Sequence, residues 1–255
     1  MPMGRLNTEF SRLYLVPDPV PPEQGHLLTT DGTVRAMVLE IARPADWTEL
    51  SAVWSGVQHD LALPAAAIAV SGTDGLQLWF SVAEPVKAQD AADFLSGLQH
   101  KYLSTTAAKR IHRYPSGAQD AAVGHRHARE VPAVHEDTGN WSAFVSPDLA
   151  SVFGEEPWLD LPPNPDQQAD ILSRLKSMKT PQFRDALGLL RAAPDAATQA
   201  AESRAEQPGN IAAAPQGYNT GKMSPKEFLM QVMNDPAVGL KDRMEAAKAL
   251  LPYAD

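Results

Sequence analysis

The order of apolar patterns between Val34 and Tyr114 limits the possible folds more than any other feature of this sequence. Four short segments have the alternation or the branched apolar run of a β-strand, and two intervening segments carry apolar residues at helical spacing. In chain order, strands are predicted at Val34–Ala42, Leu63–Val70, Leu76–Val82 and Lys109–Tyr114, with helices after Asp46 and across Phe94–Tyr102.

This β-α-β-β-α-β order is typical of the split βαβ arrangement, the ferredoxin-like or RRM-like α+β fold. Both helices of such a domain lie on one face of an antiparallel sheet. The other face stays free, and it is where these folds usually bind ligands. We therefore expect residues 1–160 to form an α+β domain with one open sheet face.

The segments around this core predict further elements. Residues Ser11–Pro17 are expected to form a short strand, and residues 139–153 one more strand and a turn. An acidic, proline-rich segment follows. Helices are then predicted at Gln167–Lys179 and Pro181–Ala192, because a proline at position 181 interrupts the pattern. Residues 161–193 therefore read as a helical extension.

The last sixty residues divide into a linker and a tail. Residues 194–222 are rich in Ala, Gln, Pro and Gly and predict a flexible linker. In residues 223–255, Ser224 is a helix cap with Pro225 at the first helical position, and a second apolar helix follows. A helical hairpin of this size has little core of its own. It is expected to contact a protein partner, a second copy or the main domain.

Composition excludes several classes of protein. The chain has no cysteine, which excludes disulfides, thiolate zinc sites and cysteine nucleophiles. No apolar run approaches the roughly 20 residues that cross a bilayer, so we expect a cytoplasmic protein without a membrane partner. A net charge of −9 argues against coating nucleic acid through the overall field, although local patches can oppose it.

The stretch "SGTDGLQLWF" at residues 71–80 is a candidate ligand site. A turn rich in Ser and Gly lets backbone amides approach a phosphate, and the strand that follows aims Gln77 at the same place. Gln77 is a neutral amide without acid-base chemistry. The predicted phosphate-binding residues of the turn are Ser71, Gly72, Thr73 and Gly75.

The longer stretch "SGTDGLQLWFSVAEPV" resembles the second motif of the archaeo-eukaryotic primase superfamily, the primase-polymerases. The resemblance covers roughly residues 35–116 and implies the fold already predicted. In that family, a first motif carries two acids one residue apart, the second carries a histidine that contacts phosphates, and a third carries another acid. The acids hold divalent metal for nucleotidyl transfer.

The departures from the family pattern imply a degenerate site. The paired acids fall on Glu40 and Ala42, the phosphate-contacting histidine falls on Gln77, and the third acid falls on His112. One glutamate is a poor substitute for the carboxylates that balance two divalent ions. We therefore expect no cofactor and no polymerase activity. The alternative is an active, divergent enzyme. In that case Glu40 would bind Mg²⁺ or Mn²⁺, and Asp74 or Asp46 would supply a further carboxylate.

The uneven distribution of charge along the chain is compatible with nucleic-acid binding. Residues 101–130 hold six Lys or Arg and two acids, whereas residues 131–170 hold eight acids and no Lys or Arg. Arg110 and Arg113 are candidate contacts to nucleotide or single-stranded DNA, and Trp79 could stack on a base. The alternatives are a solvated basic face that complements the acidic segment, and a tryptophan buried in the core.

The stretch "HRHAREVPAVHED" is a further candidate for metal binding. His125 and His127 would share one face of a strand, and His135 with Glu136 or Asp137 could complete a site. The neighbouring Gly and Pro favour instead a mobile loop with histidines that are merely polar.

The tail carries a second resemblance. The stretch "SPKEFLMQVMNDPAVGLKDRMEAAKALLPYAD" is similar to a helical segment of phage small-terminase-like proteins, which implies protein-protein contact in a phage or mobile element. Together these features suggest a degenerate primase-polymerase-like protein that binds nucleotide or nucleic acid in replication or packaging of a bacterial or phage genome. The alternatives are an interaction or scaffold protein and an active, divergent DNA primase or polymerase.

Overall fold

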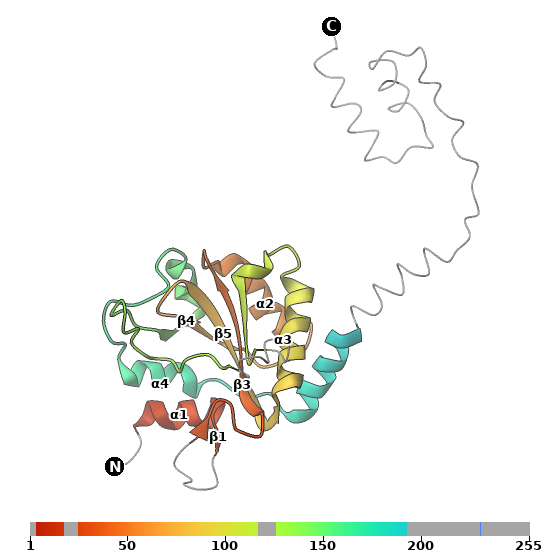
Figure 1. Ribbon diagram of the computed structural model, residues 1–255, viewed down its shortest axis with the longest axis horizontal. Helices are drawn as coiled ribbons and strands as arrows, with labels where there is room; N and C mark the ends of the chain where they lie inside the picture. Colours follow the sequence, from red (N-terminus) through yellow and green to blue (C-terminus); the bar gives the residue numbers. More distant parts are fainter. Residues whose placement is uncertain (1–3, 18–24, 117–125, 193–229, 231–255) are drawn as a thin grey trace, which may run out of the picture. The chain divides into compact units, whose positions relative to one another are not determined.

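A five-stranded antiparallel sheet is the centre of this computed structural model, which describes residues 4–17, 25–116, 126–192 and 230. The strands follow the spatial order β6-β3-β5-β4-β7 (Figure 1). Their bounds are β3 (Thr33–Ala42), β4 (Ala67–Val70), β5 (Gly75–Lys87), β6 (Ile111–Tyr114) and β7 (Ala143–Val145).

Two helices connect these strands in the predicted way. Helix α2 (Trp47–His59) joins β3 to β4, and helix α3 (Ala88–Tyr102) joins β5 to β6. The chain therefore runs β-α-β-β-α-β, and every neighbouring pair of strands is antiparallel. The predicted α+β class is confirmed. Strand β7 supplies the additional strand expected in residues 139–153, and a 3₁₀ helix, η3 (Pro147–Phe153), follows it.

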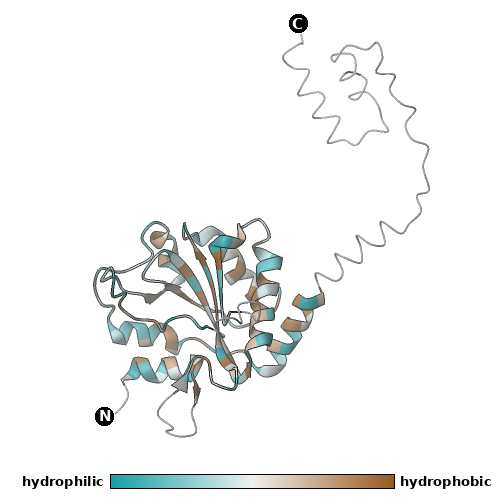
Figure 2. Ribbon diagram, viewed as in Figure 1, coloured by the Kyte–Doolittle hydropathy of each residue, from teal (hydrophilic) through white to brown (hydrophobic). Residues whose placement is uncertain are grey.

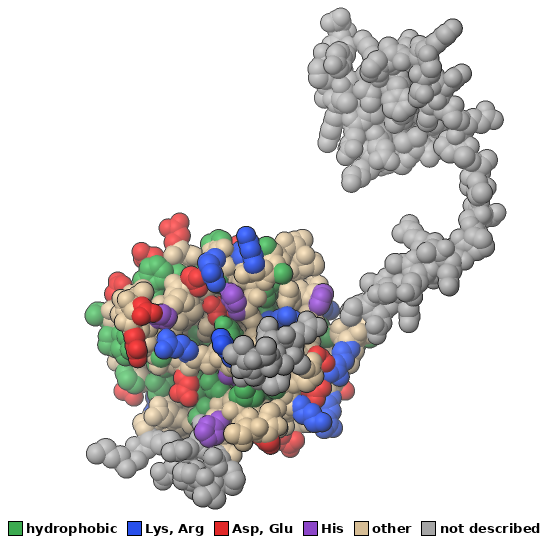
Figure 3. Space-filling model, viewed as in Figure 1, with side chains coloured by type: hydrophobic (Ala, Val, Ile, Leu, Met, Phe, Trp, Pro, Cys, Tyr) green, Lys and Arg blue, Asp and Glu red, His purple; other side chains and the backbone are tan. Residues whose placement is uncertain are grey.

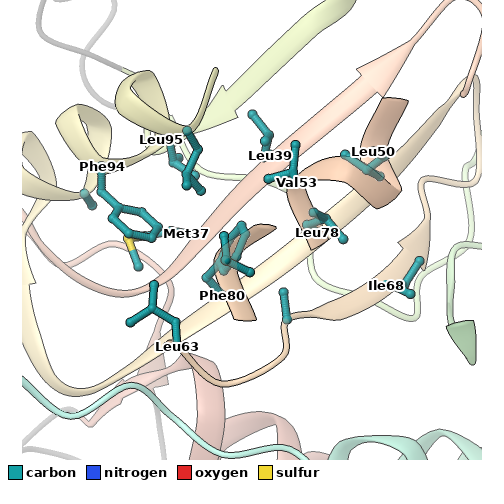
Figure 4. Packing of buried hydrophobic residues seen from close by; sticks show 14 of the residues in the cluster. Met37, Leu39, Leu50, Val53, Leu63, Ile68, Leu78, Phe80, Phe94 and Leu95 are labelled. Carbon is teal, nitrogen blue, oxygen red and sulfur yellow. The ribbon is translucent and has the colours of Figure 1, made fainter. Parts of the chain in front are cut away.

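One face of the sheet carries the larger hydrophobic cluster. Met37 and Leu39 of β3 and Leu78 of β5 point to this face, where Val53 of α2 and Phe94 of α3 cover them (Figure 4). The helices around the sheet carry both hydrophobic and hydrophilic residues (Figure 2), as helices with one buried face do. The capping residue predicted for α2 is also correct, because the Asp46 carboxylate accepts a hydrogen bond from the Glu49 amide at 3.2 Å.

The opposite face is covered, which corrects the expectation of an open sheet. Helix α1 (Arg5–Tyr14) and helix α4 (Pro165–Ser173) lie on this face, and Leu13 and Leu172 are fully buried there. The strand predicted at Ser11–Pro17 is wrong for the same reason. Phe10, Leu13 and Tyr14 lie at helical spacing and pack on the sheet as one stripe, so only Val16–Pro17 remains extended, as β1, paired with β2 (Gly25–His26).

Two arginines fasten the covering helices. The half-buried Arg35 guanidinium of β3 donates to the carbonyls of Arg12 at 2.7 Å and Leu15 at 3.0 Å, at the C-terminal end of α1. Arg12 in turn donates to the carbonyls of Leu172 at 3.0 Å and Leu175 at 3.3 Å, at the end of α4. The last carbonyls of a helix have no partner within the helix, so each arginine supplies one.

The outer edge of β7 is satisfied by a side chain rather than by another strand. The Gln168 amide of α4 accepts from the Phe144 N–H at 2.7 Å and donates to the Phe144 carbonyl at 2.9 Å. Gln168 is itself buried. A side-chain amide thus takes the place of a neighbouring peptide group, which protects an edge that would otherwise be open to pairing.

The C-terminal elements pack on the same body. The helix predicted at Gln167–Lys179 is shorter, ending at Ser173, because Met178 pairs with β5 instead: its N–H donates to the Ser81 carbonyl at 2.8 Å. A further helix spans residues 180–192, close to the prediction. Residues 1–199 form one compact unit and residues 200–255 a second. The predicted linker, 194–222, and the tail, 223–255, lie outside the described residues, except for the exposed Met230.

Candidate functional site

Three predicted site residues form one row across the sheet. Glu40 of β3 lies directly opposite Gln77 of β5 on one side and His112 of β6 on the other. Residues directly opposite each other in neighbouring strands point to the same face. The structure therefore brings together the three positions that the sequence resemblance assigns to separate motifs, on the face that α1 and α4 cover.

Hydrogen bonds join this row to the tryptophan two residues along β5. The Trp79 Nε1–H donates to Gln77 Oε1 at 2.8 Å, and Gln77 Nε2 donates to Glu40 Oε2 at 2.9 Å. Glu40 and Gln77 are each 7 % exposed and Trp79 is 1 % exposed. Because an indole only donates and a carboxylate accepts, the Gln77 amide can satisfy both partners in only one orientation.

The buried carboxyl of Glu40 resists ionisation. Burial raises its pKa above the ordinary value of 4.5, while the hydrogen bond from Gln77 and the nearby His112 oppose the rise. The same negative region affects Tyr114 on β6, whose pKa is raised first by burial and then by the charges of Glu40 and Asp74. A carboxyl of this kind holds its proton at a higher pH than an exposed glutamate does.

Gly75 makes room for the Glu40 side chain. A Cβ atom at position 75 would lie 2.8 Å from Glu40 Cγ and would also meet its carboxylate. Gly75 is opposite Ala42, the position of the second acid in the family motif. The two small residues therefore form a gap at the end of the sheet, and the Glu40 side chain fills it.

Four of the five backbone N–H groups of the turn at residues 71–75, those of Ser71, Gly72, Thr73 and Gly75, donate hydrogen bonds within the protein. The Ser71 hydroxyl accepts hydrogen bonds from the N–H groups of Thr73 at 3.1 Å and Gly75 at 2.9 Å. The Gly72 N–H donates to the Pro157 carbonyl at 3.0 Å, and a Cβ on Gly72 would lie 2.8 Å from the Ser142 backbone nitrogen. The predicted phosphate cradle is therefore already occupied by the protein's own acceptors.

Arg43 is a charged neighbour of the site that sequence reasoning missed. Its Nε lies 3.1 Å from the Asp74 carboxylate, and its N–H donates to the Asp74 carbonyl at 3.2 Å. The left-handed φ of 55° turns the chain sharply at the end of β3. Only the pairing of Ala42 with Gly75 reveals this contact, and no motif in the sequence signals it. Asp74, a carboxylate considered for an active enzyme, is thus paired with Arg43, and Asp46 serves as a helix cap.

The two arginines predicted to contact phosphate lie elsewhere. Arg110 lies 3.1 Å from the Glu49 carboxylate and donates to the Pro44 carbonyl at 2.9 Å, which ties the chain before β6 to the start of α2. Arg113 is exposed, and it alternates with His112 along β6, so it is on the opposite side of the strand. Neither belongs to the Glu40 row.

Trp79 is buried in the core, which was the alternative to base stacking. Its ring packs against Phe10 at 5.9 Å, Tyr14 at 5.2 Å and Phe144 at 6.0 Å between ring centroids. With its side chain this buried, no ring face is open to a nucleotide base. The base-stacking prediction is therefore wrong for this structure.

The histidine-rich stretch does not converge on a metal site within the described residues. They contain no group of three or more His, Cys, Asp or Glu side chains that could hold an ion. His127 Nε2 lies 3.0 Å from the Ala36 carbonyl, and burial lowers the pKa of this histidine, so its neutral ring donates that hydrogen bond. His135 is in a separate turn, and His125 is outside the described residues.

The Glu40 row does not fit a pair of divalent ions either. It offers a single carboxylate, one oxygen of which already accepts a hydrogen bond from Gln77. The second position of the motif is the methyl group of the fully buried Ala42. Two-metal transfer needs several oxygen ligands around each ion. We therefore derive no metal-dependent step from this site.

Comparison with known proteins leaves the chain without an assigned family. No family model and no curated protein match it. Among solved structures, it is similar to the polymerase domain of Mycobacterium tuberculosis Ligase D in complex with DNA, at a TM-score of 0.35 and 14 % identity. That match covers 64 % of this chain and 58 % of the polymerase domain. Within the described residues, no helix has the length and apolar character to cross a membrane.

Proposed function

We propose that this protein is a catalytically degenerate primase-polymerase-like protein that binds nucleotide or nucleic acid. The observation that carries the proposal is the row of Glu40, Gln77 and His112, because positions drawn from three separate sequence motifs meet on one sheet face. The replication or packaging of a bacterial or phage genome is the setting that the sequence resemblances suggest.

The chemistry of the row supports binding without nucleotidyl transfer. The Glu40 carboxyl is buried, is hydrogen-bonded to an amide and has a raised pKa, so it is a poor ligand for Mg²⁺. The active-enzyme alternative predicts primer extension with Mg²⁺ or Mn²⁺ that Glu40→Ala abolishes. We expect no extension from the wild-type chain with either ion. Extension that depends on Glu40 would overturn the degenerate assignment.

Exposed cations at the β6 side of the sheet supply the binding surface in this proposal. Lys109 lies just before β6, and Arg113 lies on the side of β6 opposite to His112. Arg126 lies beside the end of β6, where its N–H donates to the Ser116 hydroxyl at 3.1 Å. Among the described residues, none of these three cations forms an ion pair with a carboxylate. Lys and Arg side chains stand among acidic ones on the face shown in Figure 3. Local cations of this kind can contact phosphates despite the negative net charge.

Salt-dependent binding of labelled single-stranded DNA tests the proposal. Anisotropy titrations at low and high salt should show affinity that falls as salt rises, since each phosphate contact releases counterions. The double variant Lys109→Ala/Arg113→Ala should bind more weakly and with a shallower salt slope. Arg184→Ala, which removes an exposed arginine from helix 180–192, is the matched control and should bind like wild type.

A scaffold protein is the alternative that two observations favour. The amides of Ser71, Gly72, Thr73 and Gly75 are already bonded within the protein, and Trp79 is buried. Absence of any salt-sensitive DNA or nucleotide binding would leave this alternative ahead. Its interaction segment is then residues 223–255, so a chain lacking them should lose partner capture or self-association.

A further inference from the structure

The side chain of His127 covers a part of β3 that β6 does not reach. Strand β6 pairs with Val38–Ile41 of β3 and ends at Tyr114, so Ala36 lies past the end of β6. His127 Nε2 lies 3.0 Å from the Ala36 carbonyl oxygen and donates a hydrogen bond to it. A side chain thus supplies the donor that a neighbouring strand would otherwise supply to this carbonyl.

The residues around His127 lie against the sheet as a short irregular segment. We call residues 126–131 the His127 strap. Ala128 and Val131 of the strap are buried in the same hydrophobic cluster as α1 and α4. At its start, the Arg126 carbonyl accepts a hydrogen bond from the Ser116 N–H at 3.0 Å. The strap contains no helix or strand, so its attachment depends on these few contacts and on His127.

The attached strap requires a neutral histidine ring. The Nδ1 atom of His127 is buried and has no hydrogen-bond partner among the described residues. Burial lowers the pKa of His127 below its ordinary value of 6.5, and the backbone groups of Ala36 and Ala128 oppose this drop only in part. A second proton on the ring would therefore place a charge in an apolar site where Nδ1 has no acceptor in hydrogen-bonding geometry.

No charged neighbour compensates for protonation of His127. The ring centroid of Trp79 on β5 lies 6.4 Å from that of His127, and the titratable groups of the same cluster are Tyr14 of α1 and Tyr114 of β6. Burial raises the pKa of both tyrosines, so both are neutral. Among the described residues, no charged side chain contributes to the pKa shift of His127. This holds for the charged residues of β3 and of the strap, namely Arg35, Glu40, Arg126, Arg129 and Glu130.

We propose that the His127 strap is a pH-sensitive device, attached to the sheet near neutral pH and released in mildly acidic solution. Release uncovers the Ala36 carbonyl and the side of Trp79 that faces His127. A released histidine titrates near 6.5, so one linked proton weakens the attachment by up to about tenfold for each pH unit below that value. Arg126 moves with the strap, and only its effect on nucleic-acid binding rests on the proposed function.

Hydrogen exchange of the full chain, followed by NMR, tests the strap without any ligand. The Ser116 N–H reports attachment, because it donates to the Arg126 carbonyl. Its protection factor, corrected for the intrinsic pH dependence of exchange, should fall severalfold from pH 7 to pH 5.5. The protection factors of the β5 amides should stay constant over the same range. A Ser116 protection factor that does not change with pH overturns the proposal, whether or not the protein binds DNA.

A glutamine at position 127 separates the proton from the hydrogen bond. In His127→Gln, the side-chain amide can still donate to the Ala36 carbonyl but does not titrate, so Ser116 protection should not depend on pH. His100→Gln, at an exposed histidine of α3, is the matched control and should keep the wild-type fall. NMR titration of the wild-type imidazole should give His127 a pKa below 6.5. A fall in His127→Gln as large as in wild type, or a His127 pKa of 6.5 or above, overturns the proposal.

Discussion

At the scale of single residues, the centre of the candidate site is a hydrogen-bond relay rather than a reactive group. Gln77 accepts from Trp79 and donates to Glu40, and all three side chains are buried. A histidine at position 77 could also bond two neighbours, but its ring would have to be the correct tautomer. The amide meets both demands without any protonation, which suits a structural role at this position.

Replacing Gln77 should destabilise the fold. Gln77→Leu leaves the Trp79 indole N–H and a Glu40 oxygen buried without partners, at a cost of about 2–4 kcal/mol of unfolding free energy. Urea unfolding followed by tryptophan fluorescence measures the loss. Gln89→Leu, on an exposed position of α3, is the control and should change the unfolding free energy little. A Gln77→Leu protein as stable as the control would contradict the relay.

The raised pKa of Glu40 predicts a pH dependence of the opposite sign to that of a salt-bridged acid. Between the ordinary value of 4.5 and the raised folded pKa, the folded state binds more protons than the unfolded state, so Glu40 makes stability fall as pH rises. Glu40→Gln removes this effect. The variant should therefore gain stability relative to wild type on going from pH 4 to pH 7, measured by urea unfolding at both values. A constant difference between the two proteins would show that burial does not shift this group.

At the scale of elements, the sheet was predictable and the cover of its second face was not. Alternation in β3 and β5 fixes which residues share a face, and from it follows the row that contains Glu40 and Gln77. Helix α1 was missed because a window starting at Ser11 begins in the middle of a helix that starts at Arg5. The Arg43–Asp74 pair was missed because it depends on which strands are neighbours, which no local pattern contains.

Arg35 is expected to hold α1 on the sheet. Arg35→Ala removes three donors to carbonyls, at Arg12, Leu15 and Val82, and should cost about 2–3 kcal/mol, since hydrogen bonds from charged groups are the stronger ones. Hydrogen exchange should then show reduced protection in α1 before the central strands. Arg184→Ala serves as the control. Uniform loss of protection across the chain would assign Arg35 a global rather than a local role.

At the scale of the whole molecule, the part of the chain up to residue 192 behaves as one packed body around a sheet covered on both faces. Phe183 of helix 180–192 packs against Phe94 of α3 with ring centroids 5.5 Å apart, and both are buried in the larger cluster. Helix 180–192 therefore shares its core with α3 and the sheet.

A substitution of Phe183 tests whether helix 180–192 belongs to the core. Phe183→Ala should lower the unfolding free energy by about 3–5 kcal/mol, the usual cost of emptying an aromatic site in a core. Leu189→Ala, on the exposed side of the same helix, should change it by less than about 0.5 kcal/mol. Thermal or urea unfolding of the full chain provides the measurement. Similar small effects for both variants would indicate that the helix is only loosely attached.

The Gln168 side chain has a consequence for how copies of this sheet could join. With its two hydrogen bonds to Phe144, it seals one border of the sheet as a foreign strand would. A fibril that grows by pairing of sheet edges requires each copy to have two edge strands that can accept another strand. A sheet sealed on the β7 side can accept one only along β6, so strand exchange between copies would end with a pair and could not propagate.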